Sequence, residues 1–197
     1  MNDLFASVPE TDLGPLHDRL VAAAQADGLL DVAYRTLDTP VGTLLLAATE
    51  QGLVRVAYDV EGHDAVLATL AARVSPRVLV APGRLDPVAR ELDEYFAGSR
   101  RAFDVPLDQR LSTGFRAEVL RHLPEIGYGR TESYAQVAAA AGNVRAVRAV
   151  GSACATNPLP VVVPCHRVVS SDGSIGGYAG GPAAKRALLT LEGVGGL

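Results

Sequence analysis

Hydrophobic residues follow two different periods in the first half of the chain. Between residues 13 and 28, leucine and valine recur at three- and four-residue intervals, which predicts a helix that Gly28 can terminate. Short β-rich runs come next, separated by the turn-forming sequences DTPVG and EQG, so we predict a small antiparallel meander. The runs are DVAYRTL (31–37), TLLLAAT (43–49) and LVRVAYDV (53–60).

Helical spacing returns after the third run. Residues 63–74 and 86–98 are predicted helices. In the second, Asp86 is the expected N-cap, Pro87 occupies the first position, and Gly98 is a C-terminal stop. The first half therefore reads as an α/β domain.

The pattern changes near residue 108. An amphipathic helix is expected over residues 112–123, and two short helices over 132–142 and 143–155 are split by Gly142-Asn143, a spacing typical of a helix-turn-helix. The apolar run 161–169 is strand-like, and Asp172-Gly173 then predicts a hairpin turn. A closing helix runs from Pro182 to Gly193. We therefore predict two domains, an α/β domain over residues 1–107 and a mainly helical domain over residues 108–197.

Composition and charge restrict the possible functions. The chain has 197 residues, 48% of them hydrophobic, which is enough for a sizeable core. Its net charge of −4 combines −7 over residues 1–107 (9 basic, 16 acidic) with +3 over residues 108–197 (9 basic, 6 acidic). A basic second half would attract a phosphate backbone. No signal peptide or bilayer-spanning run is visible, and two cysteines form no disulfide framework or zinc signature, so a reducing cytoplasm is expected.

The stretch VPCHRVV (163–169) carries the candidate chemistry. It places Cys165 beside His166. Cysteine is often a buried core residue, so the dipeptide by itself leaves two readings open, an inert core thiol or a nucleophile with an adjacent base.

Further motifs around this stretch favour the second reading. Residues 115–192 resemble the C-terminal domain of the alkylguanine-DNA alkyltransferases, also called methylated-DNA–protein-cysteine methyltransferases. The matching pieces are GYGRTESYAQVA, RAVGSACATNP, VPCHRV, GGYAGG and KRALLTLE. TPVGTLLLAATEQGLVRV resembles the family's N-terminal domain, so the resemblance covers about residues 31–193. It implies a ribonuclease-H-like N-terminal domain and a winged-helix-like C-terminal domain.

The resemblance implies a suicide DNA repair protein that needs no cofactor. Cys165 would take the alkyl group from 6-O-alkylguanine as a thiolate, with His166 removing its proton through a bridging water. Glu192 would fix the histidine tautomer. Tyr134 would donate a proton to the leaving base, and Asn157 would tie the helix to the active-site strand.

The resemblance also implies base flipping from double-stranded DNA. Arg148 matches an arginine that enters the duplex in place of the flipped nucleotide, on a helix whose small residues suit a narrow minor groove. Small residues could equally pack against another helix. Asn143 is expected to cap this helix and touch phosphate. Ala135, Ser171 and Arg167 are weaker contact candidates, and a mainly structural role is the other interpretation of the arginine.

The glycine-rich GGYAGG should wrap the guanine pocket. Tyr178 would line one wall, and Val168 would offer its carbonyl to the guanine amino group. Some relatives have serine where this chain has Ala179, so the contact to the 6-oxygen must come from a backbone N–H. No cysteine precedes Cys154, so no N-terminal zinc site is expected, and Cys154 is expected to be a buried core residue.

Two rival functions use the same residues. A non-catalytic sensor of alkylated DNA would replace the cysteine, which is present here. A Cys-His hydrolase would need an oxyanion hole, and Pro164 removes one nearby N–H. We therefore predict a monomeric alkyltransferase acting on double-stranded DNA.

Overall fold

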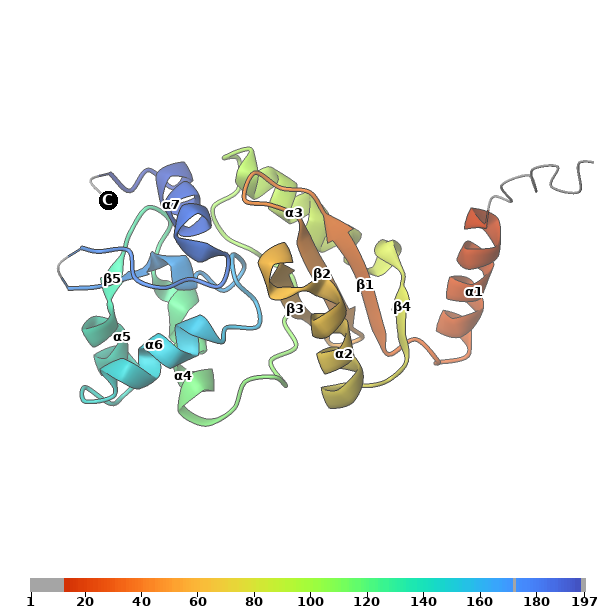
Figure 1. Ribbon diagram of the computed structural model, residues 1–197, viewed down its shortest axis with the longest axis horizontal. Coiled ribbons are helices and arrows are strands. Elements are labelled where there is room, and N and C mark those ends of the chain that lie inside the picture. The colour runs from red at the N-terminus through yellow and green to blue at the C-terminus, as the bar shows by residue number, and fades with distance from the viewer. Residues whose placement is uncertain (1–12, 172, 196–197) are drawn as a thin grey trace, which may run out of the picture.

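The structure is a computed structural model that describes residues 13–171 and 173–195. It has an N-terminal α/β domain built on a four-stranded sheet and a C-terminal domain that is mainly helical (Figure 1). The chain also forms four short 3-10 turns: η1 (Asp59–Glu61), η2 (Pro82–Leu85), η3 (Leu123–Glu125) and η4 (Cys165–Arg167).

The N-terminal sheet has the strand order β3-β2-β1-β4. Antiparallel pairing of β1 with β2 and of β2 with β3 confirms the predicted meander. The fourth strand pairs in parallel with β1 and was not predicted, because three residues give too short a pattern to recognise. The strands are β1 (Val32–Leu37), β2 (Leu44–Thr49), β3 (Gly52–Tyr58) and β4 (Val78–Val80).

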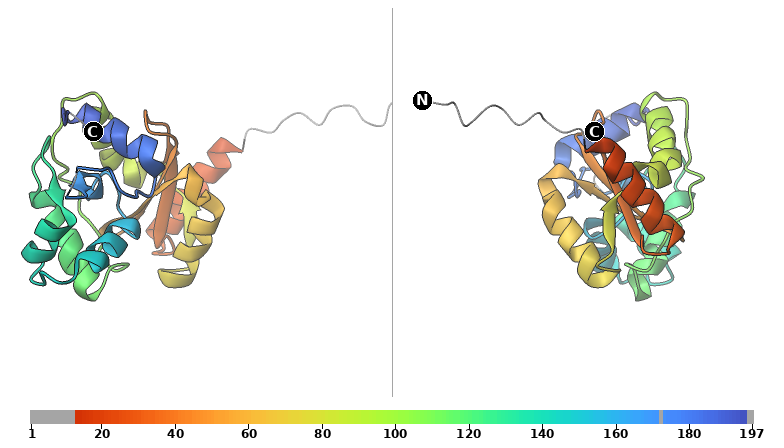
Figure 2. Two further views of the ribbon diagram at one scale, coloured as in Figure 1. Left: turned by 60° about the vertical axis from the view of Figure 1, so that its left-hand side comes forward. Right: turned by 90° about the vertical axis from the view of Figure 1, so that its right-hand side faces the viewer.

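Helices cover both faces of this sheet (Figure 2). All six residues of β2 are buried, so its alternate side chains enter two different cores. One core contains Leu44 and Leu46 with residues of α3 (Asp86–Phe96), and the other contains Leu45 and Ala47 with residues of α2 (His63–Arg73). The N-cap predicted for α3 is off by one position: Leu85 is the N-cap, and the Asp86 carboxylate instead pairs with Arg35 at 2.8 Å.

The first helix, α1 (Gly14–Ala26), forms where its apolar spacing predicts. None of its residues is buried, and the leucines that define the spacing are more than half exposed: Leu13 64%, Leu16 56% and Leu20 54%. Only Val21 and Ala24 pack against a small cluster of Leu30, Ala33 and Ala81. The apolar spacing therefore predicted the helix correctly, but the leucines that define this spacing do not form a buried face.

The C-terminal domain packs two short helices against a third. The helix-turn-helix consists of α5 (Tyr134–Ala140) and α6 (Val147–Ala155), and both contact α4 (Gly114–His122). The closing helix is α7 (Gly181–Leu191). Asn143 does not cap α6, whose N-cap is Ala146; its Oδ1 instead accepts from the N–H of Arg145 in the turn.

The strand predicted over residues 161–169 is mostly absent. Only β6 (Val168–Val169) forms, and it pairs in parallel with β5 (Glu132–Ser133). Pro160 and Pro164 cannot donate to a ladder, and Val161 has a φ of +73°, which breaks the extended backbone. Asp172 lies outside the described residues. Around it the chain turns back, because the N–H of Gly173 donates to the carbonyl of Ser170 at 2.9 Å and the N–H of Ser170 donates to the carbonyl of Ser174 at 3.0 Å. No strand follows β6 within residues 173–195, so the turn is not extended into a β-hairpin there.

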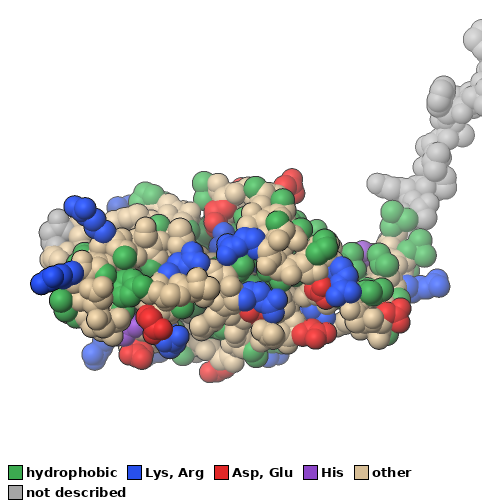
Figure 3. All heavy atoms as spheres, turned by 90° about the horizontal axis from the view of Figure 1, so that it is seen from below, with side chains coloured by type: hydrophobic (Ala, Val, Ile, Leu, Met, Phe, Trp, Pro, Cys, Tyr) green, Lys and Arg blue, Asp and Glu red, His purple; other side chains and the backbone are tan. Residues whose placement is uncertain are grey.

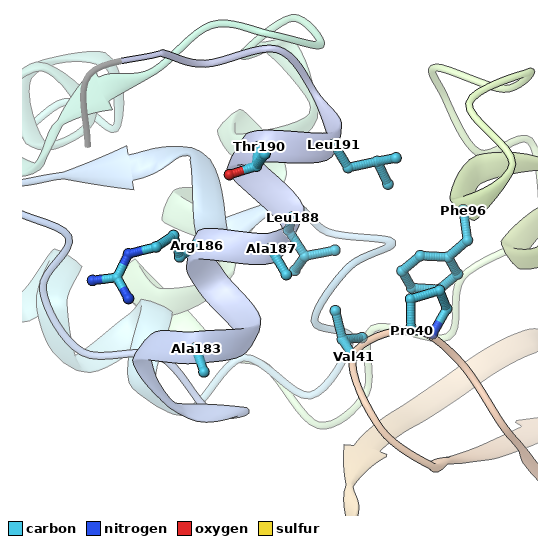
Figure 4. Close-up of a pocket in the computed structure, with 9 residues that line it drawn as sticks. All are labelled: Pro40, Val41, Phe96, Ala183, Arg186, Ala187, Leu188, Thr190 and Leu191. Carbon is cyan, nitrogen blue, oxygen red and sulfur yellow. The ribbon is translucent and has the colours of Figure 1, made fainter.

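The two domains meet along β3 and α7. The N–H of Val56 in β3 donates to the carbonyl of Pro158 at 2.8 Å, which joins the sheet edge to the C-terminal domain. An apolar pocket of about 600 Å³ lies between α7 and the N-terminal domain, and Val41, Leu188 and Leu191 point into it (Figure 4). Among the described residues, no helix combines the length and apolar character needed to cross a bilayer.

Candidate active site

The predicted nucleophile and base share one buried turn. Cys165, His166 and Arg167 form η4 and are only 2%, 0% and 6% exposed. The backbone before them is strained, because Val161 is a β-branched residue with a φ of +73°. Such a conformation costs on the order of 1–3 kcal/mol and persists only where the surrounding contacts determine it.

Asn157 supplies several of those contacts. Its Nδ2 donates to the carbonyl of Val163 at 2.8 Å and to the Sγ of Cys165 at 3.2 Å. Its Oδ1 accepts from the N–H of Leu159 at 3.0 Å. The side chain is 2% exposed, so one buried amide fixes both the loop and the sulfur.

His166 is oriented by Glu192, which follows α7. Its Nε2 lies 2.9 Å from Oε1 of Glu192. An ionised carboxylate can only accept, so the proton of neutral His166 lies on Nε2 and the lone pair on Nδ1. That Nδ1 is buried and has no hydrogen-bond partner within the described part of the chain. Burial lowers the pKa of His166 by more than the carboxylate raises it, so the ring is neutral at neutral pH.

Glu192 is held by further donors. Tyr95 Oη donates to Oε1 at 2.7 Å, and Arg167 donates to both oxygens at 2.9 Å in a bidentate pair. The N–H of Gly129 donates to Oε2 at 3.2 Å. Although burial opposes ionisation, these donors and His166 lower the pKa of Glu192 to about 2.

The sulfur itself is in a poorly solvated position. Burial raises the pKa of Cys165 to about 11, while the Asn157 amide and the Lys185 ammonium act in the opposite direction. Lys185 is fully buried, and its Nζ donates to the carbonyl of Val168 at 2.6 Å. The thiol is therefore protonated at rest, in a site with a cation to stabilise the thiolate once it forms.

Tyr134 approaches the thiols from the helix-turn-helix. Parallel pairing of β5 with β6 places Ser133 opposite Val169, and Tyr134 starts α5 directly after Ser133. A Ser133–Gln136 capping box fixes this start. Tyr134 is half-buried, and its pKa is raised by burial and by the nearby sulfurs of Cys154 and Cys165.

The GGYAGG loop lies over this cluster. A Cβ on Gly176 would lie 2.7 Å from the hydroxyl of Tyr134, so only glycine allows the loop to approach so closely. The ring of Tyr178 lies edge-on to His166, with 6.3 Å between centroids. Val168 is buried and its carbonyl already accepts from Lys185, leaving one lone pair; Ala179 is half-buried.

The predicted DNA contacts lie on the surface of the C-terminal domain. Arg148 is exposed in the first turn of α6 and has no hydrogen bond or ion pair with any described residue. The remaining candidates, Ala135, Asn143 and Ser171, are also exposed. Figure 3, which views the molecule from below, shows basic side chains on this domain together with a few acidic ones.

Arg167 and Cys154, the two remaining residues singled out in the sequence, are buried. Arg167 is not a DNA contact: it is 6% exposed, and besides Glu192 its Nη1 donates to the carbonyl of Ile126 at 2.6 Å. Its guanidinium orients the carboxylate instead. Cys154 is 4% exposed, which confirms the expectation of a buried thiol.

Several residues of this site were missed from the sequence. Lys185 is the only lysine among 18 basic residues, and a single ammonium in an arginine-rich chain was a signal that could have been used. Tyr95 and Tyr58 come from the N-terminal domain, and no spacing rule links them to residues about a hundred positions away. Among the described residues, no group of three or more His, Cys, Asp or Glu side chains could hold a metal ion.

Comparison with protein families gives two matches that together span most of the chain. Residues 32–109 match the model described as 6-O-methylguanine DNA methyltransferase, ribonuclease-like domain. Residues 114–194 match the model described as 6-O-methylguanine DNA methyltransferase, DNA binding domain.

Individual relatives agree with these matches. The methylated-DNA–protein-cysteine methyltransferase of Mycobacterium tuberculosis is 39% identical over 169 residues, covering 82% of this chain and 92% of the relative. The constitutive enzyme of that name from Bacillus subtilis is 38% identical, covering 81% and 94%. A crystal structure of Mycobacterium tuberculosis OGT in complex with DNA superposes with a TM-score of 0.70 at 38% identity, covering 82% and 93%.

Proposed function

The chain belongs to the 6-O-methylguanine DNA methyltransferase family and is a methylated-DNA–protein-cysteine methyltransferase, and we propose that Cys165 is its alkyl acceptor. The substrate is 6-O-alkylguanine in double-stranded DNA. One observation above all supports this assignment. Cys165 precedes a buried imidazole whose Nε2 is hydrogen-bonded to Glu192 and whose Nδ1 has no partner among residues 13–171 and 173–195.

The proposed reaction is a single displacement at carbon. His166 takes the thiol proton at Nδ1 through a bridging water, and Glu192 stabilises the imidazolium that forms. The Cys165 sulfur then forms a bond to the alkyl carbon while the bond from that carbon to the guanine 6-oxygen breaks. Tyr134 donates a proton to the departing guanine, so the base leaves neutral and unmodified.

The product accounts for a single turnover. A thioether has no acyl or phosphoryl centre that water could attack, so no second step restores the thiol. One protein molecule therefore removes one alkyl group and is consumed.

Access to the base requires extrusion from the duplex, which costs a few kcal/mol. We propose that Arg148, which is exposed at the start of α6 and pairs with none of the residues that the structure describes, fills the position of the flipped nucleotide. Asn143, Ala135 and Ser171 contact the DNA around it. Inside the pocket, the Val168 carbonyl, the Tyr178 ring and the N–H of Ala179 hold the guanine.

We also propose a fold type for each domain, a domain boundary, an oligomeric state and a cellular location. The N-terminal domain is ribonuclease-H-like, and the C-terminal domain is winged-helix-like. We place the boundary at residues 107 and 108, supported by the absence of any helix or strand between the Leu53–Leu107 bridge and α4. The protein acts as a monomer in the cytoplasm.

Neither rival function is favoured by the geometry. The backbone N–H of Cys165 donates to the carbonyl of Val163 at 2.8 Å, and Pro164 has none, so the two nearest amides cannot form a hydrolase oxyanion hole. A sensor without transfer has no use for a buried thiol supported by Asn157, His166 and Glu192.

A repair assay tests the assignment. A duplex containing 6-O-methylguanine is mixed with a limiting amount of protein, and restored guanine is counted over time. We expect one guanine restored per protein molecule and none with Cys165→Ser, while Cys154→Ser, at the other buried thiol, retains the full yield. Continued turnover, or undiminished repair by Cys165→Ser, would overturn the proposal.

A further inference from the structure

The N-terminal domain reaches the guanine pocket through one tyrosine. Tyr58 is the last residue of β3 and is 2% exposed. Its hydroxyl lies 3.1 Å from the hydroxyl of Tyr178, and the two rings meet edge to face with centroids 5.7 Å apart. The pair is thus a direct link between the sheet and the pocket loop.

The same ring also touches the backbone of that loop. A Cβ on Gly180 would lie 2.6 Å from the ring of Tyr58, so glycine is required for the observed approach. Tyr58 therefore contacts the loop on both sides of Ala179, the residue whose N–H is proposed to meet the 6-oxygen of the guanine.

Tyr58 is itself held in place. Its N–H donates to Oε1 of Glu61 at 2.9 Å, and Glu61 forms an ion pair with Arg55. The guanidinium of Arg55 donates to the carbonyls of Asn157 at 3.4 Å and Pro158 at 3.3 Å. One segment of the N-terminal domain thus contacts both the turn that carries Asn157 and the loop opposite it.

The loop needs such support. Four of the six residues in GGYAGG are glycine, and the segment forms no strand or helix before α7. Glycine has the largest conformational freedom to lose, so an unsupported loop of this composition would sample many shapes. A fixed pocket wall requires contacts from outside the loop.

We propose that Tyr58 is a positioning residue for the alkylguanine pocket: through its hydroxyl bond to Tyr178 and its contact with Gly180, it holds residues 176–181 in the shape that receives the base. This inference rests on the proposed function. It gives the N-terminal domain a part in the transfer step, although that domain contributes none of the reacting groups.

The test uses Tyr58→Phe in the full-length protein, which keeps the ring over Gly180 and removes only the hydroxyl. The matched control is Tyr34→Phe, which removes a tyrosine hydroxyl from β1 of the same sheet. Single-turnover rate constants are measured with a 6-O-methylguanine duplex and with the free 6-O-alkylguanine base, together with the final yield of alkylated protein and the affinity for undamaged duplex.

We expect Tyr58→Phe to slow transfer about three- to tenfold, the range for losing one hydrogen bond, and by the same factor on both substrates. Duplex affinity and final yield should be unchanged, whereas misfolding would lower the yield and leave the rate constant of the active molecules intact. Adding Tyr178→Phe should slow the reaction no further than Tyr178→Phe alone, since both changes break one bond.

Two results would overturn the inference: rates for Tyr58→Phe equal to those of Tyr34→Phe, or a loss confined to the duplex together with weaker DNA binding. Failure of the wild-type protein to take an alkyl group from either substrate would instead refute the proposed function.

Discussion

Replacing His166 by glutamine should change how the transfer rate depends on pH. With a pKa of about 11, Cys165 alone would be ionised in about three molecules per ten thousand at pH 7.5. In the proposed mechanism the wild-type protein avoids this dependence, because the proton moves from sulfur to His166 within the site. Its rate should be flat across neutral pH and fall only below 6.5, since burial lowers the pKa of His166.

Without the imidazole, the thiolate must form by loss of its proton to solvent. The variant His166→Gln should therefore be slower at pH 7.5 by about 10²- to 10⁴-fold, the usual contribution of a general base. Its rate should rise about tenfold per pH unit from 7 to 10, because the fraction of thiolate rises by that factor. Single-turnover transfer from a 6-O-methylguanine duplex, measured across this range, gives both profiles. A flat profile for the variant, or a steadily rising one for the wild type, would refute the assignment of His166 as the base.

Three other perturbations have expected outcomes. The pKa of Glu192 falls from 4.5 to about 2, so ionised Glu192 contributes about 3 kcal/mol of stability above pH 4.5, which is lost as the pH falls towards 2. The variant Glu192→Gln should therefore lower the free energy of unfolding at pH 7 by at least that amount, and the free energy should depend less on pH in the acid range. Urea titration at several pH values measures both effects, and an acid dependence equal to that of the wild type would contradict the reasoning. Asn157→Leu removes a hydrogen-bond donor from the sulfur, so the pKa of Cys165 should rise further. The rate of alkylation by iodoacetamide, measured across alkaline pH, should have its midpoint at a higher pH than in the wild type, and a midpoint at a lower pH would be inconsistent with the contact. Arg148→Ala should slow repair of duplex DNA more than reaction with the free modified guanine, and equal losses on both would argue against base flipping by this residue.

Most residues of the candidate site could be predicted from the sequence, because they lie in contiguous motifs. Cys165 and His166 are neighbours in the chain, and Glu192 and Tyr134 stand within recognisable segments on either side. The meander and the helices also followed from local periodicity, since a repeating pattern of apolar residues reports which faces of an element can be buried.

The features that could not be predicted from the sequence depend on contacts between segments that are distant in the chain. The apolar run 161–169 has the composition of a strand, but Pro164 and the left-handed Val161 make it a buried turn, held by its own backbone hydrogen bonds and by the side chain of Asn157. The buried role of Arg167 depends on Glu192, which is 25 residues away. Leucine spacing predicts α1 but not the exposure of its leucines, because burial depends on which surface is available to cover them.

The central claim is that the alkyl group ends on the sulfur of Cys165. Intact-protein mass spectrometry after incubation with a 6-O-methylguanine oligonucleotide, followed by peptide mapping, tests it most directly. We predict a gain of one methyl group per molecule, located on the peptide that contains Cys165, with guanine restored in the DNA. An unchanged protein mass, or a methyl group on Cys154, would contradict it.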